Sequence, residues 1–538
     1  MRRPSQHTRM ENYTSSHHYS VYLGWALILM SLALAVTRRW PSVMAHNGLR
    51  LPPGPWQLPV IGSLHHLVGV LPHIAMRNLA SRHGQVMLLR LGEVPTLVVS
   101  SPDAAREVMR TQDLAFATRP LTATMRVLSC GGRDMVFAPY GDHWRQVRKI
   151  AVTQLLSEHR VRSFRAIREE EVAHMVRGVE SAALAGTAVE MRALLSAFVA
   201  DGTFRAVMGD RCDYKQRDLF LRELDIMVGL ATGLNPADLW PSSWLAGRLS
   251  NALHRARESH ATVFGIIKDV IQEHLERRKQ GQSGEDAEGE EDMLDVLLKI
   301  QEEGGIDMVA VEAVIFDMFG AGSETSATTL EWALAELIRN PTVLNKATAD
   351  VRSAFEARGT VDEGRLSDLP YMRLVIRETL RLHPPLPLLL PRKCREPCKL
   401  LGYDVPIGTQ VIVNAWAIGR DERCWGPDAS EEFRPERFED ANLGVDLRGT
   451  DFQLLPFGAG RRMCPGMAFG LANVELPLAS LLLHFDWEAP GIHEPTEFDM
   501  TEAVGVTARR KANLLLHPTL RVALPGGNTV TGMTQTTI

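Results

Sequence analysis

Cysteine is scarce in this sequence, whose 538 residues include six: Cys130, Cys212, Cys394, Cys398, Cys424 and Cys464. So few thiols in so long a chain exclude a disulfide scaffold and favour a reducing compartment for the main body. A zinc site is disfavoured as well, because Cys394 and Cys398 have no second pair at zinc-type spacing.

An excess of one charge is missing too. Lys and Arg number 59 against 64 Asp and Glu, a formal net charge of -5. Without a basic field the chain has no general attraction for phosphate backbones, so nucleic acid is excluded as a partner. Internal repeats and linkers inside the main body are also missing. Although 538 residues suggest several domains, we therefore expect one large catalytic domain over residues 57–525.

The stretch from Phe457 to Gly466 combines a thiol, two guanidinium groups and glycines at positions 458, 460 and 466. Glycine tolerates φ > 0 and lets the backbone pass close to a flat cofactor, so we expect this geometry at all three positions. A thiolate binds metal, and backbone N–H groups together with a metal charge would hold its proton off. We interpret Cys464 as the axial ligand of a haem iron, with Arg462 reaching a haem propionate. The alternative is a buried structural thiol in a glycine-rich turn.

The spacing of Phe457, Gly460, Arg462, Cys464 and Gly466 resembles the haem-binding loop of the cytochrome P-450 monooxygenases, above all their plant membrane-bound members. The resemblance extends over almost the whole chain. It implies the cytochrome P-450 fold, mainly α with a small β region, and iron protoporphyrin IX (haem b) with its iron on Cys464. The cofactor-binding residues that it implies are Trp144, Arg148, Arg392, Phe457, Gly458, Arg462, Cys464 and Gly466.

The first 40 residues have the pattern of a membrane anchor. Residues 1–20 are polar, and an apolar run over 21–36 is followed by two arginines, so we expect a transmembrane anchor over 21–40 with the body cytosolic. A cleaved signal peptide is the alternative. If translation began at Met10, the three arginines before it would be absent. Arginine would then flank the apolar run only on its C-terminal side. The sequon at Asn12 is usable only if this end is lumenal.

A proline-rich hinge over residues 41–56 follows the anchor, and a polar tail over 526–538 ends the chain. Leu51–Pro55 should stay extended, because proline cannot continue a helix. An ordinary proline-rich linker is the alternative. The resemblance implies that the anchor crosses the endoplasmic reticulum membrane once.

Periodicity predicts mostly helices between these ends. Val86 to Ser100 reads as two strands around a Gly-Glu turn, and residues 280–292 read as an acidic loop. The predicted helices include Trp144–Arg148, Val263–Lys279, Asp307–Asn340, Tyr371–Leu382 and Met467–His484. Trp144 and Arg148 share a helical face, which the resemblance assigns to haem propionates and which would otherwise be an amphipathic pair.

The long helix contains two glycines, at 320 and 322, followed by Ser323, Glu324 and Thr325. Such residues weaken the helical hydrogen-bond ladder, so we expect a local bulge that opens room beside a cofactor. The resemblance implies that Gly322 faces bound oxygen and that Glu324 and Thr325 deliver the protons needed to cleave it. The alternative is that the glycines only permit close helix packing.

Three further segments carry expectations. Glu378 and Arg381, with Arg437, resemble the family's buried ionic triad, which is structural rather than catalytic. Leu388, Leu389 and Leu390, in an extended segment that leads to Arg392, should face the substrate. The resemblance also places Val504, in the last turn before the C-terminal segment, against the substrate.

The combined expectation is a monooxygenase that hydroxylates or epoxidises a lipophilic plant metabolite. The chain has no dinucleotide fingerprint, so the resemblance supplies a membrane-bound NADPH-cytochrome reductase as electron donor and O2 as cosubstrate. By analogy we expect a terpenoid substrate, with phenolic lipids, indoles and oximes as alternatives. A haem-thiolate enzyme that rearranges peroxides without a reductase is the alternative activity.

Overall fold

The computed structural model describes residues 48–209, 214–279, 291–439, 445–492, 494 and 497–524. The predicted polar segment 1–20 with Met10 and Asn12, the anchor 21–40, the first part of the hinge and the polar tail 526–538 lie outside these residues. Most of the predicted acidic loop also lies outside them. These predictions stay untested.

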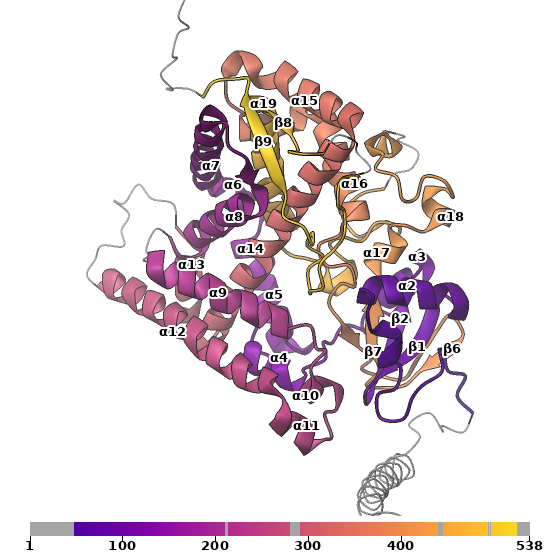
Figure 1. The fold of residues 1–538 in the computed structure, drawn as a ribbon. Helices are drawn as coiled ribbons and strands as arrows, with labels where there is room; N and C mark the ends of the chain where they lie inside the picture. Colours follow the sequence, from indigo (N-terminus) through magenta and orange to yellow (C-terminus); the bar gives the residue numbers. More distant parts are fainter. Residues whose placement is uncertain are drawn as a thin grey trace, which may run out of the picture.

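Helices make up most of the body, as predicted (Figure 1). Several are single turns, whereas α12 and α14 each cross much of the molecule. The helices are α2 Pro72–His83, α3 Pro102–Arg106, α4 Ala123–Leu128, α5 Asp142–Ile150, α6 Glu158–Ser163, α7 Arg165–Ala185, α8 Met191–Met208, α9 Tyr214–Leu230, α10 Pro236–Leu239, α11 Trp244–Leu249, α12 Asn251–Lys279, α13 Met293–Glu302, α14 Met308–Arg339, α15 Pro341–Phe355, α16 Pro370–Leu382, α17 Ala415–Ile418, α18 Glu422–Trp425 and α19 Met467–His484.

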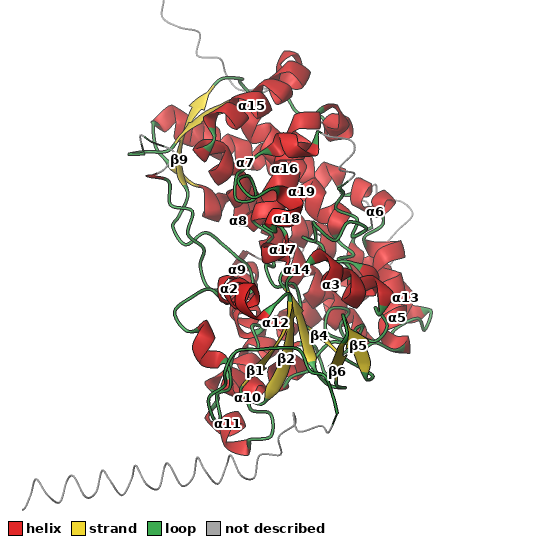
Figure 2. Cartoon of the chain, turned by 90° about the vertical axis from the view of Figure 1, so that its right-hand side faces the viewer, coloured by secondary structure: helices red, strands yellow, loops and turns green. Residues whose placement is uncertain are grey.

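The strands form small sheets at two ends of the body (Figure 2). One sheet has the order β1-β2-β7-β4, in which β1 and β2 are the antiparallel pair predicted for residues 86–100, with Val86 opposite Val99. A second has the order β3-β9-β8, and β5 pairs with β6. The strands are β1 Val86–Leu91, β2 Val94–Val99, β3 Val189–Glu190, β4 Arg392–Lys393, β5 Cys398–Leu400, β6 Tyr403–Val405, β7 Gln410–Val413, β8 Phe485–Glu488 and β9 Leu515–Leu520.

The proline-rich segment is extended, as predicted, and it lies along β1. The N–H of Leu88 donates to the carbonyl of Pro53 at 2.8 Å. A Cβ on Gly54 would stand 2.1 Å from the carbonyl oxygen of Leu88, so only glycine permits this approach. This part of the hinge is therefore fixed to the sheet.

Helix α14 runs through the centre of the body with the predicted bounds (Figure 1). The Asp307 side chain caps its N-terminus by accepting from the N–H of Ala310, and Pro341 already begins α15. The predicted bulge is wrong, because α14 is a continuous α-helix through residues 319–325. The Thr325 hydroxyl donates to the Ala321 carbonyl at 2.8 Å within this continuous helix.

Among the described residues, α19 is the helix that is long and apolar enough to cross a membrane. However, 67% of that segment is buried inside the body. Its apolar side chains pack with those of α14 and α16 in one hydrophobic cluster. We therefore assign α19 to the core.

Candidate active site

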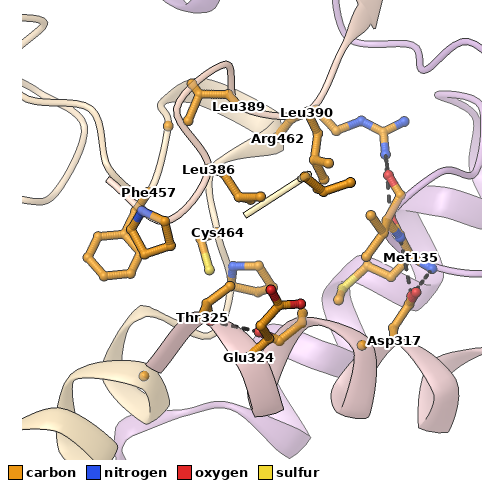
Figure 3. A pocket seen from close by; sticks show the side chains of 18 of the residues that line it. Met135, Asp317, Glu324, Thr325, Leu386, Leu389, Leu390, Phe457, Arg462 and Cys464 are labelled. Atoms are coloured by element: carbon orange, nitrogen blue, oxygen red, sulfur yellow. Dashed lines mark hydrogen bonds between the residues drawn. The ribbon is translucent and has the colours of Figure 1, made fainter. Parts of the chain in front are cut away.

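A cavity beside the middle of α14 brings together most of the predicted site residues, and Figure 3 shows Cys464 and the Glu324–Thr325 pair entering it from different elements. The side chains come from α5, α14, the segment before β4 and the loop before α19. The predicted residues that line it are Trp144, Arg148, Glu324, Thr325, Leu389, Leu390, Arg392, Phe457, Gly458, Arg462 and Cys464.

Gly322 and Val504 do not line this cavity, so the structure corrects both placements. A Cβ at Gly322 would make an ordinary contact with Thr203 at 3.6 Å, so Gly322 faces α8 rather than the cavity. Val504 is 79% exposed. Val506, two positions further along the same irregular turn, lines the cavity instead.

Leu388 is also misplaced by the prediction. It packs against a separate hydrophobic cluster that includes Met87 and Leu89 of β1. The cavity is lined instead by Leu386, Leu389 and Leu390 (Figure 3). The segment has no regular period, so the sequence alone did not show which leucines turn inward.

The loop before α19 has the predicted geometry at two of its three glycines. Gly458 and Gly460 have φ of 67° and 68°. A Cβ at Gly460 would stand 2.0 Å from the carbonyl oxygen of Met109, so this glycine permits contact with protein backbone rather than with a cofactor. The prediction for Gly466 is wrong, because its φ is -92° and it caps α19. Gly466 lies outside the cavity lining.

The thiol of Cys464 is accessible from the cavity although it lies deep in the body. Burial raises the pKa of Cys464, while a hydrogen bond from the N–H of Gly466 and the charge of Arg148 lower it. The N–H of Cys464 itself donates to the carbonyl of Phe457 at 2.9 Å, which closes the loop. Because burial is the largest effect, a metal cation would be needed to complete ionisation of the sulfur.

Four buried or half-buried arginines, Arg119, Arg148, Arg392 and Arg462, stand along one side of the cavity, and we call them the arginine cluster. Arg148 donates to the Met463 carbonyl at 2.6 Å and Arg462 to that of Ala117 at 2.7 Å. Arg119, which the sequence reading missed, donates to the Leu390 carbonyl at 2.6 Å. The carboxylate in direct contact with the cluster is Asp113, at 3.1 Å from Arg392.

Positive charge in the arginine cluster exceeds the negative charge beside it. Burial lowers the pKa of all four arginines, and the neighbouring arginines lower those of Arg119 and Arg462 further, the latter to about 9. A group that carries two carboxylates would relieve this repulsion. The donors therefore fit a haem, with its propionates against the arginine cluster and its iron on Cys464.

Trp144 serves this cluster indirectly. Its indole N–H donates to the Met135 carbonyl at 3.0 Å. This N–H is therefore bonded to the protein rather than directed at a propionate as the resemblance implied. The guanidinium of Arg462 lies 4.3 Å from the centre of the Trp144 ring. We infer that Trp144 orients Arg462 by cation–π contact.

Glu324 and Thr325 lie side by side on α14 at the cavity. The Glu324 carboxylate accepts hydrogen bonds from the Thr507 hydroxyl and the Arg509 guanidinium. Arg509 also donates to Asp225 of α9 at 2.9 Å. The sequence reading did not find Arg509, because it lies 185 positions from Glu324.

Two buried carboxyls, Asp134 and Asp317, also line the cavity and were not predicted. Asp317 of α14 accepts from the N–H of Met135 at 2.7 Å and of Val136 at 3.2 Å. Burial raises the pKa of Asp134 to about 7, and burial together with Asp134 raises the pKa of Asp317. Asp317 therefore holds the 134–136 segment against α14, while Asp134 accepts locally from the N–H of Phe137.

The predicted ionic triad forms beneath the cavity. Arg381 donates to Glu378 at 2.7 and 2.8 Å, and Arg437 donates to the same carboxylate at 2.8 Å. The Arg381 and Glu378 side chains have no exposed area. Remaining Arg381 N–H groups donate to the carbonyls of Gly419, Ser430 and Glu432.

Proteins of similar sequence belong to the family that the loop around Cys464 resembles. The family model of cytochrome P-450 matches residues 52–516. Zealexin A1 synthase of Zea mays is 48% identical over 497 residues, which cover 91% of this chain and 96% of that protein. Premnaspirodiene oxygenase of Hyoscyamus muticus is 45% identical over 495 residues, which cover 91% and 97%. Dolabradiene monooxygenase of Zea mays is 48% identical over 504 residues, which cover 92% and 98%.

Solved structures share the fold. A zebra fish cytochrome P-450 determined with abiraterone aligns with a TM-score of 0.69 at 25% identity, over 84% of this chain and 99% of that one. The predicted fold class, mainly α with small sheets in a single large domain, is thereby confirmed.

Proposed function

Because the chain belongs to the cytochrome P-450 family and is a monooxygenase of that family, we propose that it oxygenates a terpenoid. The observation that carries this proposal is the apolar wall of the cavity between Cys464 and α14. The wall includes Met227, Phe316, Leu386, Leu389, Leu390 and Val506. Relatives named as a premnaspirodiene oxygenase and a dolabradiene monooxygenase support a terpenoid rather than a phenolic lipid, an indole or an oxime.

We propose that the cofactor is iron protoporphyrin IX. Cys464 would hold its iron, and the arginine cluster would hold its propionates, for which the unbalanced positive charge is the support. When bound, the haem supplies the activation of O2. The fixed loop around Cys464 sets the position at which this chemistry takes place.

The chain's own residues would bind the substrate and move protons. An apolar wall binds a hydrocarbon by burial, at about 25 cal/mol per Å², and excludes water from the reaction. Leu386, Leu389 and Leu390 would orient the hydrocarbon by shape. Glu324 would take protons from solvent and pass them to the hydroxyl of Thr325, which lines the same cavity.

We also propose that electrons come from an NADPH-cytochrome reductase and that an anchor at 21–40 holds the protein in the endoplasmic reticulum membrane, with the catalytic domain cytosolic. Lys149 is exposed beside the Cys464 face, and it supports docking of an acidic partner there. Arg461 contributes less, because it pairs with Asp113 at 3.0 Å. The plant relatives support this arrangement by analogy.

The test uses the full-length protein in microsomes with a plant NADPH-cytochrome reductase. Premnaspirodiene, alkyl phenols, indole and oximes are first screened for substrate-induced spectral shifts. We expect a terpene hydrocarbon to give a saturable shift and an oxygenated product that requires NADPH and O2. Turnover of an alkyl phenol, an indole or an oxime in place of the terpene would overturn the terpenoid assignment. Turnover of a hydroperoxide without reductase would overturn the monooxygenase cycle.

A further inference from the structure

Arg509 joins three separate parts of the cavity wall. Its guanidinium donates to the Glu324 carboxylate on α14 and, at 2.9 Å, to Asp225 on α9. The Thr507 hydroxyl donates to the same Glu324 oxygen. Met227 of α9, Glu324 and Thr507 all line the cavity. One side chain therefore links the proton-handling acid to a helix that contacts substrate.

The backbone that carries Arg509 is firmly held. The carbonyl of Ala508 accepts from the indole of Trp332 on α14 at 2.7 Å, and the N–H of Ala508 donates to the Pro385 carbonyl at 2.9 Å. The N–H of Ala503 donates to the carbonyl of Arg509 at 2.8 Å, which closes the turn. A planar guanidinium on such a support can address two carboxylates in fixed directions.

The two ion pairs of Arg509 differ in their surroundings. The side chain of Asp225 is 64% exposed and that of Glu324 is 15% exposed. An exposed ion pair contributes little because water and salt screen it, whereas a shielded pair is screened less. The contact with Glu324 is therefore the stronger one, and the contact with Asp225 mainly directs the guanidinium.

Arg509 stays a cation in this position. Burial lowers its pKa, but the hydrogen bonds and charges of Glu324 and Asp225 outweigh burial, so the net shift is upward. The other charged groups that line the cavity are Asp134, Asp317 and the arginine cluster. Among the contacts that the structure describes, Arg509 is the ion-pair partner of Glu324.

We propose that Arg509 is a positioning residue that holds the Glu324 carboxylate in the cavity wall beside Thr507 and ties it to α9 through Asp225. The proposal rests on the proposed proton role of Glu324. When Glu324 passes on a proton, the resulting carboxylate returns to its ion pair with Arg509, and Glu324 then takes the next proton from solvent.

The test compares Arg509→Gln, Arg509→Lys, Glu324→Gln and the double variant R509Q/E324Q in full-length holoprotein with reductase. The probe is the terpene hydrocarbon that gives the largest spectral shift in the screen above. For Arg509→Gln we expect about tenfold less product per NADPH consumed, since general acid–base groups contribute about 100-fold or more. The dissociation constant from spectral titration should change less than about twofold, because Arg509 itself does not line the cavity.

The lysine variant and the double variant separate positioning from a general loss of structure. The product-to-NADPH ratio should fall in Arg509→Gln and return partly in Arg509→Lys, which keeps a cation beside Glu324. The double variant should be no worse than Glu324→Gln alone. If Arg509→Gln does not retain haem, Arg509→Lys is compared with the unmodified protein instead. One ammonium group cannot span both carboxylates, so this variant also loses part of the contact.

The outcomes distinguish two failures. A Glu324→Gln variant with normal product per NADPH would overturn the proton role of Glu324. If Glu324→Gln loses coupling while Arg509→Gln behaves as the unmodified protein, the proton role stands and the positioning role of Arg509 is wrong. Losses that add in the double variant would also contradict it, because they would mean that Arg509 acts elsewhere.

Discussion

Gly460 is the residue of the thiol loop that the backbone constrains most. Its φ is 68°, and an added Cβ would stand 2.0 Å from the Met109 carbonyl oxygen. A left-handed residue other than glycine costs about 1 to 2 kcal/mol, and the clash adds to this. We therefore expect Gly460→Ala to purify with little haem and to unfold at a lower temperature, as measured by haem content and thermal denaturation.

Gly466 provides the matched control in the same loop. Its φ is -92°, and the nearest side-chain atom to an added Cβ is a Leu156 methyl at 4.0 Å. The N–H that lowers the pKa of Cys464 is kept in alanine. Gly466→Ala should retain haem and stability, and equal losses in the two variants would contradict this account of the loop.

Asp134 should make stability depend on pH. Burial raises its pKa to about 7 in the folded protein from an ordinary value of 3.8. The folded state therefore holds a proton that the unfolded chain releases, and this contribution is present at low pH and lost as pH rises through about 7. Asp134→Asn cannot ionise, so relative to the unmodified protein it should gain stability from pH 5 to pH 8.

The size of this pH effect should be up to about 3 kcal/mol before relaxation, since about two pKa units separate pH 5 from the folded pKa of about 7 and each corresponds to about 1.4 kcal/mol. Thermal denaturation of both proteins at the two pH values measures it. The amide oxygen of asparagine can still accept from the N–H of Phe137, which keeps the local turn. A stability difference that stays constant or reverses with pH would show that Asp134 is ionised throughout.

At the scale of elements, α16 depends on the charge network that Arg381 completes. Glu378 has no exposed side-chain area and accepts from both Arg381 and Arg437. Removing one partner of a buried pair costs about 3 to 5 kcal/mol, because the remaining charge is left unpaired. Arg381→Ala should therefore lose haem and stability together.

Haem content and thermal unfolding, compared with Arg352→Ala as a control, check this prediction. Arg352 also forms an ion pair, with Asp486 at 2.7 Å, but it is partly exposed. Replacing it should cost about 1 kcal/mol or less. An Arg381→Ala protein with full haem content would refute the structural role of the triad.

Elements with local signals were predictable from the sequence. The capping Asp307 and the following Pro341 bound α14, and alternating apolar residues with a Gly-Glu turn gave β1 and β2. Each of these signals lies within one element or beside it, where helix and strand periods apply. The ionic triad came instead from the resemblance to the family, because the Glu378–Arg381 spacing alone indicates only a pair on one helical face.

Contacts between distant segments were not predictable. Arg119 meets Leu390 across 271 positions, and Arg509 meets Glu324 across 185. Gly322 was placed on the wrong face because α14 has apolar residues on all sides, so its sequence does not show which face meets the cavity. Val504 and Leu388 lie in irregular segments, whose side-chain directions follow no period.

At the scale of the whole molecule, the body brings five distant parts of the chain around one cavity. The loop before α19 supplies the thiol, α14 the acid and hydroxyl, α5 and β4 one arginine each, and α9 part of the apolar wall. The sheet containing β1 and β4 fixes Arg392 relative to the proline-rich segment. The site therefore forms only when the whole domain has folded.

The binding of iron through the sulfur of Cys464 is the claim on which the whole account depends. The most direct measurement is the carbon monoxide difference spectrum of the reduced, full-length protein. We predict the long-wavelength Soret band that thiolate coordination gives, and its loss in Cys464→Ser. A haem-containing protein that shows only the short-wavelength band of neutral ligands, or a Cys464→Ser variant that keeps the long-wavelength band, would contradict the account.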